Sequence, residues 1–334
     1  MRPGKIMLAL LLLAGAAHAE DAPDAEAELA AAIAILKAHH LNRDKADWPA
    51  VEAEARQMLD DKTKPTDAYP AIRYVIAQLG EKHTFLASAD YAKAQMTDKA
   101  AGNARPPDIH TPEGYLLAGG IGLITLKFHH GSPADDIAYA KAGRDVLARF
   151  ARAHVCRYLV DLRGNGGGNI YPMINGLQAL LGPEPYGYSQ YVGGAEEPRT
   201  LANAPYMPVG DAAVDPRQRE WQGAAPVAVL MDRDTASSGE FAAMSFEGRP
   251  HTRFFGEPTA GYLTINGHYN LPDGAFLAVS VGWSTDRLHR TYRETITPDD
   301  ATARGQATVD AAIAWLRQQP CHAAPPDHAT GAPQ

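Results

Sequence analysis

The stretch Asp234-Thr235-Ala236-Ser237-Ser238-Gly239-Glu240-Phe241 places two serines between a predicted strand and a predicted helix. The apolar residues 228–231 before it have strand length, and residues 241–246 after it can continue as a helix. A serine at such a turn lies at a helix N-terminus, where free N–H groups and the helix dipole stabilise negative charge. Acyl-transfer chemistry needs this stabilisation because its intermediate carries an oxyanion. The alternative is a simple helix cap, with Glu240 completing a capping box.

The first nineteen residues have the pattern of a secretory signal peptide. Arg2 and Lys5 form a basic start, residues 6–13 form a short apolar core, and Ala17-His18-Ala19 is a small-x-small cleavage site. The apolar run is too short to span a bilayer, and no cysteine follows the cleavage site to carry a lipid anchor. We therefore expect residues 1–19 to be removed and the protein to be exported to the periplasm or the extracellular space.

Composition and charge exclude some classes of partner. The chain has 334 residues, 45% of them hydrophobic and 21% charged, which is ordinary for a globular protein. Loss of residues 1–19 would remove two positive charges and change the net charge from -8 to about -10. This acidity argues against nucleic acid or an anionic membrane surface as the main partner and is compatible with cationic peptide substrates.

The chain has two cysteines, Cys156 and Cys321. In an oxidising compartment they can pair and tie the C-terminal end to the core, and the alternative is two unpaired buried thiols. No cysteine and histidine spacing resembles a zinc site, so we expect neither a metal nor a cofactor.

The pattern of helices and strands predicts two parts. Amphipathic helices over residues 24–42, 48–60 and 67–79, with Thr66 or Asp67 capping the third, form a helical N-terminal unit at 20–105 that ends in a polar linker. Beyond residue 110, predicted strands alternate with helices, which is typical of parallel crossover units and an α/β core over 110–320. The strands are expected at 121–128, 158–162 and 276–281, and the helices at 133–153, 171–181 and 307–316.

Two segments do not fit this alternation. Residues 183–225 contain many prolines and glycines and form a long insertion, with strands expected only in its early part. Long loops in compact domains are often functional, so this insertion is either a cover over the site or surface decoration. The tail 322–334 is rich in alanine and proline and is predicted to be disordered.

A glycine-rich turn, Arg163-Gly164-Asn165-Gly166-Gly167-Gly168, follows the predicted strand at 158–162. It lacks the Lys-Ser/Thr ending of a P-loop and the spacing of a dinucleotide fingerprint. Its remaining chemical use is to bring backbone N–H groups close to a substrate carbonyl, which glycine permits because it has no Cβ. A purely structural turn is the alternative.

Three motifs together resemble the carboxyl-terminal processing (tail-specific) serine peptidase family. They are Asp161-Leu162-Arg163-Gly164-Asn165-Gly166-Gly167-Gly168, Thr235-Ala236-Ser237-Ser238-Gly239-Glu240 and Gly256-Glu257-Pro258-Thr259-Ala260-Gly261, followed by Leu271-Pro272-Asp273-Gly274. The resemblance spans about residues 115–300. It implies an α/β core of stacked β-β-α units related to the crotonase and ClpP folds, and hydrolysis of peptides near their C-termini.

The same resemblance implies roles for individual residues. Ser237, rather than Ser238, is the expected nucleophile. The expected donors to the oxyanion are the backbone N–H groups of Ser238 and Gly167, with Gly168 as the alternative to Gly167.

The chain departs from the family at two points. The processing peptidases use a serine and lysine pair, with the lysine directly after the Gly-Glu-Pro-Thr-x-Gly motif, and here that position is Tyr262. A tyrosine with an ordinary pKa near 10 is a poor base at neutral pH. No segment of the size of their PDZ domain is evident either. Both features are similar to the serine and histidine branch, which includes tricorn-type peptidases and the nisin-resistance protein. That branch carries a Gly-x-x-His-Ser/Thr segment, matched here by Gly80-Glu81-Lys82-His83-Thr84.

His83 is the expected general base. A serine hydroxyl needs a neighbouring base, and histidine titrates close to neutral pH. The alternatives are that His83 is a solvated histidine at a helix end, or that the base is Lys82 with a strongly lowered pKa. Thr84 is a candidate to orient the imidazole, and Glu294 and Asp286 are candidates for a third catalytic group.

The remaining histidines have weaker claims. His129 and His130 could suggest a metal pair, but adjacent residues on a strand point to opposite faces. His251, His268 and His289 have no better claim to a role.

The sequence thus predicts an exported serine peptidase with Ser237 as nucleophile and His83 as base. Two alternatives remain open: an inactive relative that binds peptide C-termini without cutting them, and a hydrolase for esters or other acyl donors.

Overall fold

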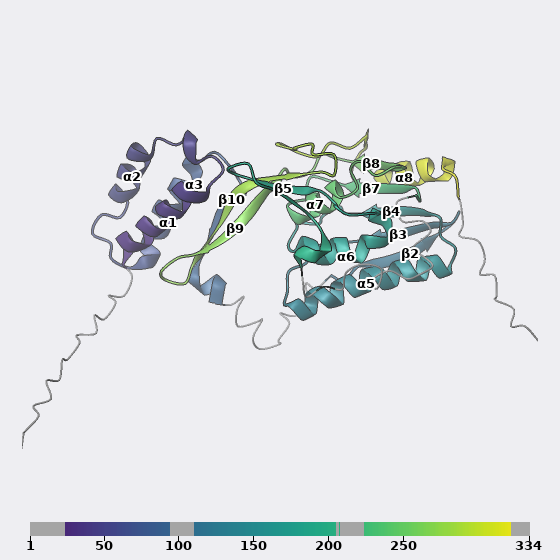
Figure 1. Cartoon of the computed structure of the whole chain (residues 1–334), viewed down its shortest axis with the longest axis horizontal. Helices are drawn as coiled ribbons and strands as arrows, with labels where there is room; N and C mark the ends of the chain where they lie inside the picture. Colours follow the sequence, from purple (N-terminus) through teal and green to yellow (C-terminus); the bar gives the residue numbers. More distant parts are fainter. Residues whose placement is uncertain (1–23, 94–109, 205–206, 208–223, 322–334) are drawn as a thin grey trace, which may run out of the picture.

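The computed structural model describes residues 24–93, 110–204, 207 and 224–321. The expected signal peptide, much of the linker, most of the late insertion and the tail 322–334 lie outside the described residues. Figure 1 shows a helical unit at one end, an α/β core at the other, and a long hairpin running between them. The mixed α/β architecture with a helical N-terminal region confirms the expected fold class.

The helical unit consists of α1 (Ala25–His39), α2 (Trp48–Gln57) and α3 (Tyr69–Gln78), close to the predicted ranges. A short 3-10 turn, Pro65–Ala68, precedes α3, so the N-cap of α3 is Ala68. The prediction of Thr66 or Asp67 as this cap was wrong, because the Asp67 carboxylate accepts the Lys64 N–H at 3.0 Å and closes the preceding turn.

A six-stranded sheet forms the centre of the core. Its strand order is β11 (Asp300–Ala301), β8 (Thr252–Gly256), β7 (Val227–Met231), β4 (Arg157–Asp161), β3 (Ile121–Thr125), β2 (Glu113–Leu117). All neighbouring pairs are parallel except β2 with β3. The parallel strands confirm the crossover units that the alternating pattern predicted.

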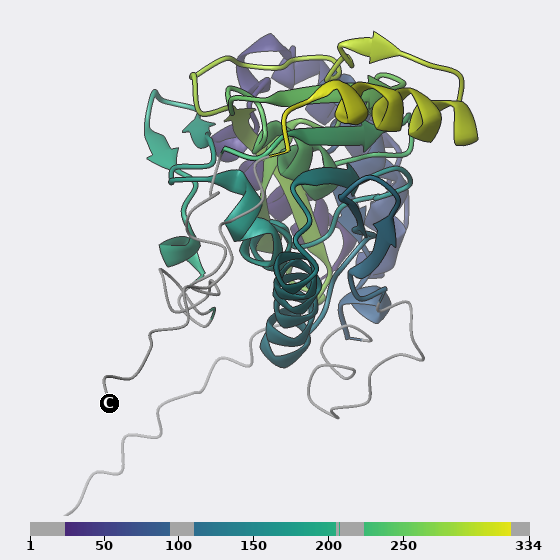
Figure 2. The same cartoon turned by 90° about the vertical axis from the view of Figure 1, so that its right-hand side faces the viewer.

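Helices cover both faces of this sheet, as Figure 2 shows. One face packs against α5 (Pro133–Arg152), α6 (Ile170–Leu181) and α7 (Ser238–Met244), and the other against α8 (Gln306–Gln318). Successive strand side chains point to opposite faces, so Val160 joins the first cluster and Leu159 the second. The carboxyl ends of the parallel strands share one edge, and the glycine turn, the serine turn and the 256–261 motif all leave from it.

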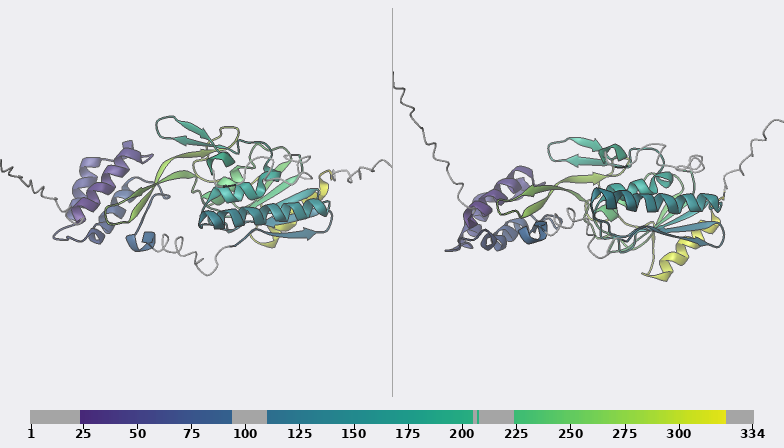
Figure 3. Two further views of the ribbon diagram at one scale, coloured as in Figure 1. Left: turned by 60° about the horizontal axis from the view of Figure 1, so that its bottom comes forward. Right: turned by 90° about the horizontal axis from the view of Figure 1, so that it is seen from below.

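A second, antiparallel sheet joins the two parts. It contains β1 (Phe85–Ala87), β5 (Tyr188–Tyr191), β6 (Glu196–Pro198), β9 (Thr264–Asn270) and β10 (Phe276–Thr285). Figure 3 shows the β9–β10 hairpin reaching from the core to the helices, with β5 and β6 beside it. Leu277 and Val279 of β10 pack into the hydrophobic cluster of α1 and α3. Strands β5 and β6 confirm the strands expected early in the insertion.

Candidate active site

Ser237 lies at a strained turn between β7 and α7. Its backbone angles are φ 51° and ψ -120°, a combination that residues other than glycine rarely adopt. Such a conformation costs roughly 1–3 kcal/mol and persists only where the surroundings enforce it. Ser237 is the N-cap residue of α7, and Glu240 accepts its N–H at 2.9 Å, as the capping-box pattern predicted. A strained serine between a strand and a helix exposes its hydroxyl as in the nucleophile elbow of other hydrolases.

Glu240 connects the serine turn to the segment after β8. Its buried carboxylate also accepts the Gly261 N–H at 2.7 Å, the Tyr262 N–H at 2.7 Å and the Thr259 hydroxyl at 2.5 Å. Burial raises the pKa of Glu240, while these hydrogen bonds oppose the rise. The Ser237 and Tyr262 N–H groups share one oxygen, Oε2, so the two backbones lie side by side.

The glycine turn packs directly against the serine turn. A Cβ added to Gly167 would lie 2.8 Å from the Ser237 Cβ, and one added to Gly168 would overlap the His129 carbonyl oxygen. Both glycines have positive φ, +105° and +103°, so this turn requires glycine twice over. The Ser238 hydroxyl donates to the Gly168 carbonyl at 2.7 Å and joins the two turns.

The two glycines that could donate to the oxyanion differ in whether their N–H group already has an acceptor. The Gly167 N–H is buried and donates to Asn165 Oδ1 at 3.0 Å. Gly168 is exposed, and within the described residues neither its N–H nor that of Ser238 has an acceptor. The structure therefore leaves Ser238 and Gly168, rather than Gly167, with amides available for an oxyanion.

The backbone of His129 is hydrogen-bonded to the glycine turn. Its N–H donates to the Gly167 carbonyl at 3.1 Å, and its carbonyl accepts the Asn169 N–H at 2.7 Å. Its buried ring bonds Asp136 at 2.7 Å, and the other Asp136 oxygen accepts the Asn169 side chain at 2.7 Å. Within the described residues no group of three histidine, cysteine or acidic side chains could hold a metal ion.

His83 reaches the same region from the helical unit. Its half-buried ring makes an edge contact with the Tyr262 ring, the centroids 5.2 Å apart, and its Nδ1 lies 3.0 Å from Thr264 Oγ1. Burial lowers the pKa of His83. Glu81 and a hydrogen bond to the Thr264 backbone oppose this by favouring the imidazolium, and Lys82 adds to the lowering. Through Tyr262 and Glu240, contacts link the imidazole to the Ser237 turn, 154 positions later in the chain.

Lys82 contacts the segment around Tyr262 beside the site. The exposed Lys82 ammonium donates to the Ala260 carbonyl at 2.6 Å and lies 4.9 Å above the centre of the Tyr262 ring. Residue 262, where the processing peptidases have their lysine, therefore carries an aromatic ring that is itself covered by a lysine from the helical unit. These contacts give Lys82 a role in joining the two parts of the molecule.

The structure gives the imidazole a partner that the sequence did not reveal. Asp286 is buried and bonded to Arg290 and Tyr292, at 2.6 and 3.0 Å, and Glu294 is exposed. The Thr84 hydroxyl accepts the Ser280 N–H. The hydroxyl group that contacts the His83 ring belongs to Thr264, and this hydroxyl in turn contacts Ser280 and Glu81. Glu81 stands two positions before His83, but nothing in the sequence pairs this segment with positions 264 and 280.

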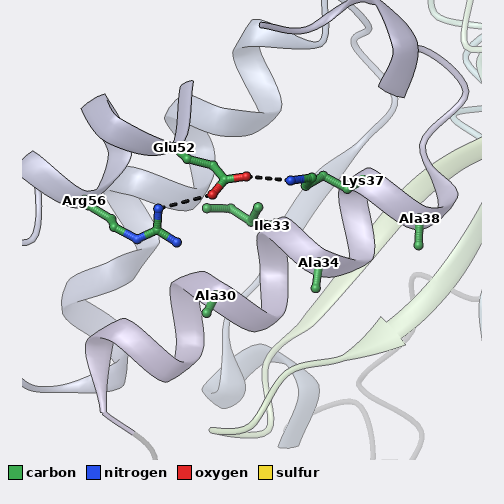
Figure 4. Close-up of a pocket in the computed structure, with 7 residues that line it drawn as sticks. All are labelled: Ala30, Ile33, Ala34, Lys37, Ala38, Glu52 and Arg56. Atoms are coloured by element: carbon green, nitrogen blue, oxygen red, sulfur yellow. Dashed lines mark hydrogen bonds and ion pairs between the residues drawn. The ribbon is translucent and has the colours of Figure 1, made fainter. Parts of the chain in front are cut away.

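A separate depression lies between α1 and α2, and none of its lining residues belongs to the glycine turn or the serine turn. Its volume is about 440 Å³. Figure 4 shows its lining residues, which are Ala30, Ile33, Ala34, Lys37, Ala38, Glu52 and Arg56. The Glu52 carboxylate accepts from both Lys37, at 2.7 Å, and Arg56, at 3.1 Å. These charges compensate one another, and the lining residues of this groove include no serine, cysteine or histidine.

Comparison with known proteins places the chain in a family. A model described as Peptidase family S41 matches residues 120–302. The chain belongs to peptidase family S41. This confirms the resemblance to the carboxyl-terminal processing peptidases and makes the protein a serine-type peptidase.

Similar proteins support the same assignment. The nisin-resistance protein of Lactococcus lactis is 28% identical over 280 residues, covering 83% of this chain and 82% of that protein. A carboxyl-terminal-processing protease of a Picosynechococcus strain is 31% identical over 43% of this chain, and one of a Synechocystis strain is 31% identical over 54%. This S41 peptidase spans only 31% and 37% of the length of those two proteases.

Solved structures share the fold. A lipoprotein from Streptococcus agalactiae superimposes with a TM-score of 0.73 at 24% identity, over 88% of this chain and 96% of that one. A photosystem II D1 C-terminal processing protease gives a TM-score of 0.57 at 14% identity, over 87% and 97%. In the described part of the S41 peptidase, no helix combines the length and the apolar character that crossing a membrane requires.

Proposed function

We propose that the protein is an exported serine peptidase in which Ser237 is the nucleophile and His83 the general base. The observation that carries this proposal is the shared Glu240 carboxylate, which holds the strained Ser237 backbone next to Tyr262, against whose ring the imidazole packs. Family membership supports peptide hydrolysis. At the position where the processing peptidases have their lysine, this chain has Tyr262.

The proposed reaction follows from the groups present. His83 removes the proton from the Ser237 hydroxyl as the oxygen attacks the substrate carbonyl, and then gives that proton to the leaving amine. The acyl-enzyme is hydrolysed when His83 activates a water molecule in the same way. The amides of Ser238 and Gly168 donate to the oxyanion, and Ser238 also benefits from its position at the start of α7.

Gly167 has a different role in this scheme. Its own N–H is bound to Asn165, and its missing Cβ makes room for the Ser237 side chain. We therefore assign the second oxyanion donor to Gly168, the alternative that the resemblance left open.

The proposed substrates are peptides cut near their C-termini. Similarity to two carboxyl-terminal-processing proteases supports this class, and the acidic net charge of -8 favours cationic peptides. Similarity to the nisin-resistance protein makes nisin a natural member of a substrate panel.

Export is supported by two independent features. The first nineteen residues carry the basic, apolar and small-residue pattern of a signal peptide. Cys156 and Cys321 form a disulfide, which excludes the alternative of two free thiols and which persists in oxidising compartments. The similar nisin-resistance protein and streptococcal lipoprotein are consistent with a location in the cell envelope or outside the cell.

A fluorophosphonate probe for active serines tests the proposal. We expect the wild-type enzyme to be labelled and Ser237→Ala to be unlabelled and inactive, with an unchanged circular dichroism spectrum. Absence of labelling in the wild type would favour the peptide-binding alternative. A panel of cationic peptides with free or amidated C-termini, together with simple esters, distinguishes peptide from ester hydrolysis.

A further inference from the structure

A short chain of hydroxyl groups lies behind the His83 ring. Thr264 Oγ1 is 3.0 Å from the imidazole Nδ1 and 2.8 Å from Ser280 Oγ, and Ser280 Oγ is 2.8 Å from Glu81 Oε2. Thr264 also has a longer direct path to Glu81 Oε1, at 3.3 Å. Both hydroxyl residues are buried. Three separate elements meet here: the segment before β1, strand β9 and strand β10.

The carboxylate fixes the direction of every hydrogen bond in this chain. Burial raises the pKa of Glu81, but hydrogen bonds from Ser280 and from the His83 and Thr84 N–H groups outweigh burial and lower it. An ionised carboxylate can only accept, so Ser280 donates to Glu81. Thr264 then donates its single hydroxyl proton to Ser280 or directly to Glu81, and its oxygen lone pair faces the imidazole.

We propose that Glu81 is a positioning residue that sets the tautomer of His83 through the hydroxyls of Thr264 and Ser280. The Thr264 lone pair accepts a proton held on Nδ1, which leaves Nε2 unprotonated. This proposal rests on the proposed function, in which Nε2 takes the proton of Ser237. In the other tautomer Nε2 would carry a proton and could not act as a base.

The same residues also hold the backbone of the histidine. Glu81 Oε1 accepts the His83 N–H at 2.7 Å, and the Asn266 side chain donates to the His83 carbonyl at 3.0 Å. Ser280 has a single hydroxyl proton, which here goes to Glu81 rather than to Asn266 Oδ1 at 3.1 Å, so it is Glu81 that joins the backbone anchor to the hydroxyl chain. The ring is therefore fixed both at its backbone and at Nδ1, which leaves it little freedom to rotate.

Glu81 has a second consequence for the reaction. The charged and titratable groups facing the imidazole are Glu81 and Lys82 from its own segment and Tyr262 from the turn after β8. Of these, Glu81 favours the imidazolium, which forms when His83 takes the serine proton. The carboxylate thus opposes the effect of burial at the moment when the ring becomes charged.

The test uses Thr264→Val, which keeps the shape of the side chain and removes the hydroxyl, with Thr264→Ser as the matched control. The tautomer is read from ¹⁵N spectra of the resting enzyme with labelled histidine, and the His83 signals are assigned by their loss in His83→Ala. We expect the Nδ1–H form in the wild type and in Thr264→Ser, and its loss in Thr264→Val. We expect kcat of Thr264→Val to fall on the order of 10²–10⁴-fold with little change in KM.

Two further variants test the other members of the hydroxyl chain, Ser280 and Glu81. Ser280→Ala should have a smaller effect than Thr264→Val, because Thr264 keeps its direct path to Glu81. Glu81→Gln should lower the pKa of His83 further, visible both in the ¹⁵N titration and as a shift of the acid limb of kcat/KM to lower pH. Should Thr264→Val not fold, the ¹⁵N spectra and titrations of Ser280→Ala and Glu81→Gln decide the question.

The spectra are recorded without substrate, so they separate this proposal from the function on which it rests. An Nε2–H tautomer in the wild type, or Thr264→Val with an unchanged spectrum and full kcat, would overturn the role of Glu81 even if Ser237→Ala and His83→Ala are inactive. Full activity of His83→Ala would instead refute the proposed function, whatever the tautomer.

Discussion

Single residues at this site are explained by what they touch rather than by their type. Tyr262 occupies the family's lysine position, yet it contributes a ring edge to His83 and an N–H to Glu240. Neither contact uses its hydroxyl. We therefore assign residue 262 a structural role, and in the proposed function the base is His83, from another element.

Substitution at these two positions should have opposite outcomes. Tyr262→Phe keeps the ring and the N–H group and should retain most of the activity. His83→Ala removes the base and should lower kcat/KM on the order of 10⁴-fold, as in comparable knockouts of a catalytic histidine or its partners. Steady-state kinetics on one peptide substrate measures both variants. An inactive Tyr262→Phe beside an active His83→Ala would show that the base is misassigned.

The pH dependence of activity follows from the burial of His83. Burial lowers the pKa of the imidazole below its ordinary value of 6.5. Because the base must be neutral, kcat/KM should stay constant as the pH falls through 6.5 and decline only at lower pH. A pH profile of kcat/KM measures this limb. A limb above pH 6.5 would contradict a buried imidazole as the base.

At the scale of elements, the glycine turn depends on its contacts with the segment after β3 and with α7. Gly168 lies against the His129 carbonyl on one side and the Ser238 hydroxyl on the other. Two residues earlier, a Cβ added to Gly166 would meet no other atom within 4 Å, and the φ of Gly166 is not positive. These two glycines form a natural comparison within one turn.

Alanine should therefore be tolerated at one of these positions and not at the other. Gly168→Ala forces the turn away from His129 and displaces the proposed oxyanion donor, so kcat should fall on the order of 10²-fold or more. Gly166→Ala should keep near wild-type kcat, as measured with the same substrate. Equal rates for the two variants would contradict the assignment of Gly168.

The joint between α1 and the β9–β10 turn contains a close pair of carboxyl groups, of which one, Glu28, is buried. Glu28 is fully buried, accepts the Asp273 N–H at 3.1 Å and lies beside the Asp273 carboxyl, which also accepts the Tyr69 hydroxyl at 2.6 Å. Burial, followed by the interaction with Asp273, raises the pKa of Glu28 from 4.5 to about 7. The protonated form is therefore favoured in the folded protein.

The stability of the protein should consequently fall as this group ionises. A raised pKa contributes stability that is fully present below the unfolded value of 4.5 and is lost as the pH rises through 7. The loss from this group can reach about 3 kcal/mol. Glu28→Gln should remove this part of the pH dependence, as urea unfolding at several pH values would measure. An identical pH dependence in wild type and variant would refute the prediction.

At the scale of the whole molecule, the β9–β10 hairpin and the disulfide each connect segments that are far apart in the chain. The β9–β10 hairpin carries core residues into the hydrophobic cluster of the helical unit, and this brings Thr264 to His83. The Cys156–Cys321 disulfide closes a separation of 165 residues and fastens the end of α8 to the start of β4. The hairpin brings together residues of the proposed site, whereas the disulfide lies among core elements that contribute no proposed catalytic residue.

Removing the disulfide should therefore affect stability more than catalysis. The double variant Cys156→Ser and Cys321→Ser should lose roughly 2–5 kcal/mol in its free energy of unfolding. Its kcat at a temperature well below the unfolding transition should stay close to that of the wild type. Denaturant unfolding and kinetics measure the two quantities, and a large loss of kcat in a folded double variant would contradict this separation.

The sequence alone determined the elements and the chemistry that each could carry. Periodicity located the helices and the parallel strands, and the motifs around Gly168, Ser237 and Gly256 gave the family, because these signals are local in the chain. Which groups meet depends on the tertiary fold. In the described residues the Gly167 N–H donates to Asn165 and that of Gly168 has no acceptor, and the groups beside the His83 ring are Thr264 and, through it, Glu81, rather than Glu294 or Asp286. Such contacts as that of His83 with Thr264 join positions more than 150 residues apart, and they depend on how the hairpin packs on the helices rather than on any local pattern.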